Sequence, residues 1–118
     1  MKRDMDLIRR ILLEMEKLPM TGGWYNLEIV GHSRDEMIYH VRLMDEAGLI
    51  EAQDLTTLQG IDWCPKRITY TGHEFLDAAR NDKVWKTAKD RVLSATGTLT
   101  LEAMKLALGA AMKALLTG

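Results

Sequence analysis

A helix in the middle of the chain carries strong signals for both its beginning and its end. Ser33 and Glu36 have the spacing of a capping box, in which each side chain accepts a hydrogen bond from a backbone amide that the first turn leaves unpaired. Gly48 stands where such a helix ends, because glycine adopts the left-handed conformation of a helix stop at little cost. The sequence therefore predicts a helix over residues 34–47. Its expected buried side chains are Met37, Val41 and Met44.

Two short runs with the alternation of strands follow this helix. Residues 49–52 (LIEA) form the first run and residues 67–71 (RITYT) the second. We expect them to pair as a β-hairpin whose long tip, residues 55–66, contains Gly60 and Pro65.

On the N-terminal side of this unit, Asp4 is expected to cap a first helix, which Pro19, Gly22 and Gly23 end. The apolar face of that helix consists of Leu7, Ile8, Ile11, Leu12 and Met15. Residues 24–31 are ambiguous. Their alternation favours a short strand, and one irregular helical turn is the alternative.

On the C-terminal side, Thr71 and Glu74 form a second capping box and predict a helix that begins there. A helix over residues 83–95 is expected to end at Gly97, and a last helix to cover residues 100–116. The last helix has an apolar stripe that either packs back on the chain or pairs with a second copy, and we expect a homodimer. The stripe residues, our candidates for dimerisation, are Leu101, Met104, Leu108, Ala111, Met112 and Leu115. Residues 1–80 are expected to form one domain and residues 81–118 a helical extension.

Composition narrows the function classes. The 118 residues are 47% hydrophobic and carry a net charge of −1. The chain includes one cysteine, Cys64, so we expect a cytoplasmic protein without disulfides. Residues 31–60 hold two arginines and six carboxylates, a net charge of −4, whereas residues 80–91 carry +3. We find no glycine-rich phosphate loop, nucleophile elbow or metal-ligand spacing, so no enzyme activity, cofactor, metal or small-molecule ligand is expected, and no contact with a membrane.

The run SRDEMIYHVRLMDEAGLIEA, followed by RITYTGHEFLDAAR, resembles the recognition helix, wing and next helix of bacterial winged-helix regulators. More closely, the chain resembles a family of small bacterial and prophage-associated proteins of unknown function. The matching stretches are residues 1–13, 39–52 and 69–85. The resemblance implies an α+β, mostly helical fold, with a winged helix-turn-helix-like domain and a C-terminal helical extension, in a phage context.

In the winged-helix regulators the recognition helix enters the major groove of double-stranded DNA and the wing touches phosphate. Carried over to this chain, the resemblance implies DNA contacts by Arg34, Asp35, Ile38, Tyr39 and Arg42 on the helix and by Lys66 and Arg67 on the wing. Two features depart from the pattern: residues 24–31 lack a clear preceding helix, and the recognition helix bears four carboxylates. Ile38 suits a protein partner as well as a thymine methyl group.

Two hypotheses about function follow. The first is a dimeric DNA-binding protein in transcription regulation. The second is a protein-interaction module on the same fold that does not bind DNA.

Overall fold

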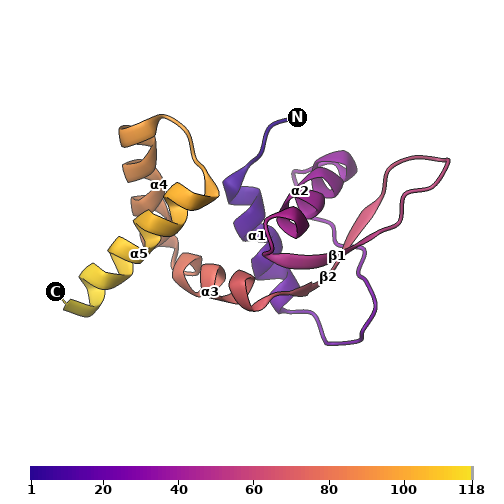
Figure 1. Cartoon of the computed structure of the whole chain (residues 1–118), viewed down its shortest axis with the longest axis horizontal. Coiled ribbons are helices and arrows are strands. Elements are labelled where there is room, and N and C mark those ends of the chain that lie inside the picture. Colours follow the sequence, from indigo (N-terminus) through magenta and orange to yellow (C-terminus); the bar gives the residue numbers. More distant parts are fainter. Residues whose placement is uncertain (118) are drawn as a thin grey trace. The chain divides into compact units, whose positions relative to one another are not determined.

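In the computed structural model, which describes residues 1–117, the chain forms five helices and one two-stranded antiparallel sheet (Figure 1). The elements are α1 (Met5–Glu16), α2 (Arg34–Glu46), β1 (Ile50–Asp54), β2 (Trp63–Ile68), α3 (Tyr70–Ala79), α4 (Asp82–Thr96) and α5 (Leu101–Thr117). This confirms an α+β, mostly helical fold. The chain divides into two compact units, Met1–His73 and a second unit that begins at Glu74. Independent folding of residues 1–80 stays a prediction.

The first helix begins where the sequence predicts it. The Asp4 carboxylate accepts hydrogen bonds from the backbone amides of Asp6 (2.9 Å) and Leu7 (3.2 Å), which the first turn of α1 cannot pair internally. All five side chains of the predicted apolar face are buried. They form one side of the core of the first unit.

Helix α2 has the predicted capping box. The amide of Glu36 donates to Ser33 Oγ, and the amide of Ser33 donates to Glu36 Oε1, each over 3.1 Å. Gly48 takes the left-handed conformation, with φ of 76°, just after the helix. The predicted inward residues Met37, Val41 and Met44 are buried.

His40 connects α2 to the start of α1. Its imidazole is 1% exposed, and its Nε2 accepts a hydrogen bond from the backbone amide of Asp4 over 2.8 Å. Because Nε2 is the acceptor, Nδ1 carries the proton that is donated to the carbonyl of Glu36, also over 2.8 Å. The buried ring therefore has both nitrogens bonded and fixes the N-cap of α1 against α2.

The hairpin follows α2, but its second strand begins at Trp63 and not at Arg67. The tip is therefore residues 55–62, shorter than predicted. Pro65, which was assigned to the tip, lies inside β2 opposite Ala52. Both strands of a two-stranded sheet are edge strands, which tolerate a residue that lacks an amide proton.

A β-bulge interrupts the ladder at Lys66. Glu51 pairs with Arg67 and Ala52 pairs with Pro65, so Lys66 is the extra residue between them. The bulge changes which face of β2 each side chain occupies from there to Trp63.

The prediction of a strand over residues 24–31 was wrong. These residues form an irregular, extended segment that donates one backbone hydrogen bond to β2, from Tyr25 to the carbonyl of Pro65 over 2.9 Å. Their alternation is real in burial, since Ile29 is buried and Leu27 half-buried between exposed neighbours. It predicted which side chains point inward, but not whether a partner strand was present.

Helix α3 also begins earlier than predicted, at Tyr70, so Thr71 and Glu74 do not form a capping box. The cap is Thr69, whose hydroxyl accepts a hydrogen bond from the amide of Gly72 over 3.0 Å and donates to the carbonyl of Gly48. The amide of Thr69 donates to the carbonyl of Leu49 over 3.0 Å. Tertiary partners at the base of the hairpin thus determine where α3 starts.

The second unit contains the rest of α3 with α4 and α5. Asn81 caps α4, and Gly97, with φ of 76°, ends it as predicted. Trp85 packs edge-on against Phe75 with ring centroids 6.1 Å apart. Helix α5 packs against α4 and buries Met104 and Leu108. None of the helices in residues 1–117 has the length and apolar character required to cross a bilayer.

Replacement of Gly72 by alanine should destabilise the first unit. A Cβ atom at Gly72 would lie 1.9 Å from the carbonyl oxygen of Leu49 and 2.7 Å from Ile68 Cγ2, and backbone atoms cannot move aside easily. We expect Gly72→Ala to lower the free energy of unfolding by about 1–3 kcal/mol or more, as overpacking does. Gly109→Ala in α5 is the control, because a Cβ there meets nothing within 4 Å. It should raise helix stability by about 0.5–1 kcal/mol. Urea unfolding followed by circular dichroism measures both, and equal midpoints would contradict the assigned contact.

Candidate functional site

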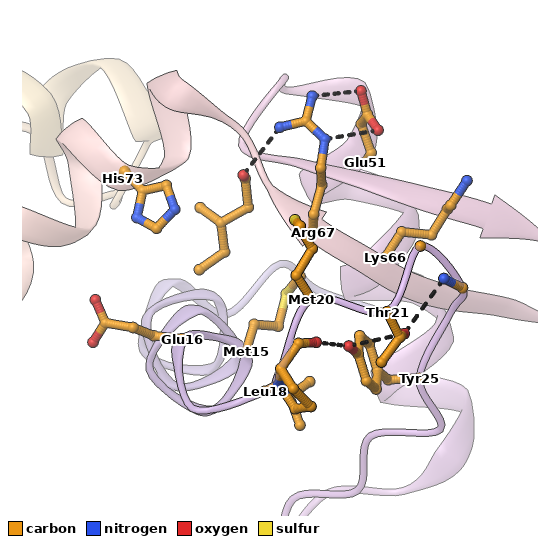
Figure 2. A pocket seen from close by; sticks show the side chains of 14 residues that line it. Met15, Glu16, Leu18, Met20, Thr21, Tyr25, Glu51, Lys66, Arg67 and His73 are labelled. Atoms are coloured by element: carbon orange, nitrogen blue, oxygen red, sulfur yellow. Dashed lines mark hydrogen bonds and ion pairs between the residues drawn. The ribbon is translucent and has the colours of Figure 1, made fainter.

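The seven candidate DNA-contacting residues lie in two groups rather than on one surface. Arg34 and Arg42 on α2 both contact the part of β2 nearest the hairpin tip, and their neighbours Ile38 and Tyr39 are half-buried. Asp35 is exposed at the start of α2. Lys66 and Arg67 line a cavity formed with the end of α1 and residues 18–25 (Figure 2). The structure therefore separates the wing candidates from the helix candidates.

Arg34 links three segments that are far apart in the sequence. Its guanidinium donates to Asn26 Oδ1 (3.2 Å), to Cys64 Sγ (3.3 Å) and to the carboxylate of Asp62. Burial by itself would lower the pKa of Arg34, but the hydrogen bonds to Cys64 and Asp62 outweigh it and raise the pKa. The side chain thus stays a cation. Its donors hold the start of α2 to the hairpin and to residues 18–33, the connector between α1 and α2.

Arg42, two turns further along α2, is also engaged within the domain. Its Nε lies 3.6 Å from Glu46 Oε1, and its guanidinium carbon lies 5.7 Å from the centroid of the Trp63 ring, within cation–π range. The stacking places the arginine on the hairpin rather than away from it.

Arg67 forms a two-pronged ion pair across the hairpin with Glu51. The Arg67 Nε to Glu51 Oε2 distance is 3.0 Å, and the Nη2 to Oε1 distance is 2.7 Å. The hydrogen bonds from Arg67 lower the pKa of the Glu51 carboxyl group and raise the pKa of the guanidinium. Lys66, in contrast, forms no ion pair within the described part of the chain.

The hairpin tip has a composition that the sequence analysis did not single out. Residues 55–62 contain no lysine or arginine, and the side chains of Leu58 and Ile61 are exposed. Backbone hydrogen bonds close the tip: the amide of Leu55 donates to the carbonyl of Asp62 over 2.7 Å, and Thr57 and Gly60 pair with each other. An ordered turn therefore presents apolar side chains to solvent. The sequence feature that would have indicated these exposed side chains is the presence of apolar residues next to Thr and Gln within a predicted turn.

The candidate dimerisation stripe is divided along α5. Met104 and Leu108 are buried in the single chain, and Leu101 and Ala111 are half-buried. Met112 and Leu115 are exposed, together with Leu106 and Leu116, which the stripe did not include. The exposed residues of the predicted stripe thus lie in the last turns of α5.

The side chains of His32 and Cys64 both have polar neighbours. Within residues 1–117, no cluster of three or more His, Cys, Asp or Glu side chains has the geometry to hold a metal ion. His32 Nδ1 lies 3.2 Å from Glu36 Oε2, and the Cys64 thiol is buried.

Comparison with known proteins places the chain among relatives of unassigned activity. A family model described as "Hypothetical protein (DUF2513)" matches residues 2–98. A protein of Haemophilus influenzae, described as "Uncharacterized protein", is 39% identical over 106 residues, which cover 89% of this chain and 90% of the relative. No solved structure gives a significant match.

Arg34→Ala should loosen the hairpin tip and the connector, because three acceptors lose their shared donor. We expect faster hydrogen exchange at the amides of Leu55 and Tyr25, whose partners lie on the segments that Arg34 joins. Arg10→Ala is the control, since Arg10 pairs only locally with Glu14 on the surface of α1. Hydrogen exchange with mass spectrometry measures both variants. Unchanged exchange in Arg34→Ala would show that the guanidinium does not hold these segments.

Proposed function

We propose that this chain, which belongs to the DUF2513 family of hypothetical proteins, is a binding module that contacts a partner protein through α2 and the hairpin tip. The order α1, α2, hairpin and α3 supports a winged-helix-like arrangement of the first unit. The arrangement lacks the helix that usually precedes the recognition helix, since residues 18–33 are irregular.

The observation that carries the proposal is the chemistry of the hairpin tip. A wing that touches DNA needs cations for phosphate, whereas this tip exposes Leu58 and Ile61 and offers only the carboxylate of Asp62. Exposed apolar side chains on an ordered turn are typical anchors for a protein surface.

The charges beside the tip support the same conclusion. Each of the three candidate arginines has a carboxylate partner: Asp62 for Arg34, Glu46 for Arg42 and Glu51 for Arg67. Exposed ion pairs are weak, about 0.2–1 kcal/mol, so a phosphate would be able to replace a carboxylate at one arginine. The displaced carboxylates would remain close by, however, and residues 31–60 carry −4. The fitting partner is a protein with an apolar pocket and a basic rim.

Double-stranded DNA is the second candidate, favoured by a different observation. Helix α2 leads directly into the hairpin, and the side chains of Arg34 and Arg42 are 39% and 52% exposed. Long guanidinium side chains on such a helix are able to turn outward to bases or phosphates.

A DNA-binding assay separates the two candidates. We expect fluorescence anisotropy with labelled mixed-sequence duplexes to show no saturable binding at low salt, because carboxylates surround the cations. Binding that weakens steeply with added salt and disappears in a variant with alanine at Arg34, Arg42, Lys66 and Arg67 would favour DNA instead.

A photo-crosslinking amino acid at position 58 tests the protein partner directly. We expect a cross-linked protein in cells that is lost when Ile61→Ser is added, since both residues would enter the same pocket. The same amino acid in place of the exposed Lys86 on α4 is the control. Absence of any cross-link from position 58, or its persistence with Ile61→Ser, would contradict the proposal.

The dimer also remains our proposal, now restricted to the end of α5. Leu115 and Leu116 are 66% and 82% exposed. Leu115→Ser with Leu116→Ser should halve the mass measured by light scattering, whereas Lys113→Ser on the same exposed segment should leave it unchanged. These point variants are sharper than removal of α5, which would also uncover the core around Met104 and Leu108. A monomeric wild-type chain would rule out self-association.

A further inference from the structure

The cavity bordered by Lys66 and Arg67 lies within the first unit. It measures about 540 Å³ and lies between the end of α1, residues 18–25 and β2 (Figure 2). This volume is in the range of small-molecule sites, about 300–1,000 Å³. All of its lining residues belong to Met1–His73.

The lining combines an apolar part with a polar rim. Met15, Leu18 and Ile68 supply the apolar surface. The rim carries the cations Lys66 and Arg67, the imidazole of His73 and the carboxylates of Glu16 and Glu51. Methionine side chains are flexible and adapt to ligands of different shape. The side chain of Met20 also borders the cavity, although it is 99% exposed, and a ligand in the cavity would cover it.

The loop that borders the cavity is held in place rather than loose. The hydroxyl of Tyr25 donates to the carbonyl of Pro19 and lies 3.2 Å from the Thr21 hydroxyl (Figure 2). The amide of Tyr25 is in turn bonded to Pro65 in β2. The wall is therefore largely formed before any ligand arrives, which reduces the entropy lost on binding.

The bulge in β2 explains why two cations border one cavity. Consecutive residues of a regular strand point to opposite faces, yet Lys66 and Arg67 both line this space. The extra residue in the ladder allows both to do so. Arg67 is already paired with Glu51, whereas Lys66 has only a weaker electrostatic contact with Glu51 and forms no ion pair within residues 1–117. Its ammonium is therefore the cation on the rim that a ligand anion can approach.

We propose that this cavity binds a small amphipathic carboxylate, with its carboxylate near Lys66 and its apolar body against Met15, Leu18 and Ile68. An apolar wall beside one unpaired cation fits a molecule that joins a hydrocarbon body to a single negative charge. The site lies apart from the hairpin tip, so it is a ligand site in addition to the proposed partner surface. Sequence patterns did not indicate this site, because its walls come from α1, residues 18–25, both strands and α3.

Decanoate is the probe and decan-1-ol its uncharged match, both kept below the concentration at which they aggregate. Methionine methyl groups, labelled with ¹³C in the full chain, report on the site by NMR. We expect saturable shifts at Met15 and Met20 with decanoate, weaker binding of decanol, and no shift at Met104, which is buried in the second unit.

Lys66→Met removes the charge and keeps the apolar stem. It should weaken decanoate binding about five- to tenfold and leave decanol unchanged, whereas Lys86→Met on α4 should change neither. Met20→Asp, at a position that contributes nothing to the core, should weaken decanoate through repulsion. Equal affinities for decanoate and decanol, an unaffected Lys66→Met variant, or no saturable shift at Met15 would each overturn the proposal.

Discussion

The hydroxyl of Thr69 makes the contact on which the arrangement of the first unit depends. It donates to the carbonyl of Gly48, just after α2, and accepts from the amide of Gly72 in α3, while its own backbone amide donates to the carbonyl of Leu49. Two strands alone are marginally stable in water, so the hairpin requires closure at its base. Gly72 lies against the carbonyl of Leu49, where no other residue fits. One residue thus sets how α2, the hairpin and α3 meet.

The ion pairs formed by the candidate arginines also hold segments of the first unit together. Arg34 connects the connector, α2 and β2, and Arg67 with Glu51 bridges the two strands. A ligand that displaced these guanidinium groups from their carboxylates would therefore also remove contacts that hold the hairpin. In the proposed complex, a partner that contacts Arg34 would also contact the residue that is hydrogen-bonded to Asp62 at the end of the tip.

Local signals in the sequence were sufficient to predict where most helices begin and end. They were insufficient where a residue distant in the sequence determines the boundary of an element. The caps Asp4 and Ser33 and the stops Gly48 and Gly97 were correct, because they depend on residues within one turn. The start of α3 was misplaced, because Thr69 is selected by Gly48 and Leu49 across the hairpin. The strand predicted over residues 24–31 had the burial pattern of a strand but no ladder. In the candidate site, the sequence identified the charged residues but not the ion pairs between them. These pairs join residues far apart in the sequence, and hydrophobic periodicity carries no information about them.

The bulge at Lys66 also fixes the orientation of the only thiol. Trp63 to Pro65 occupy their present faces because one residue is unmatched in the ladder, and Cys64 consequently meets the guanidinium of Arg34 over 3.3 Å. Loss of a single residue there would reverse the faces of that half of β2, since side chains alternate along a strand. Cys64 would then no longer meet the guanidinium of Arg34, and β2 would lose this hydrogen bond to the start of α2.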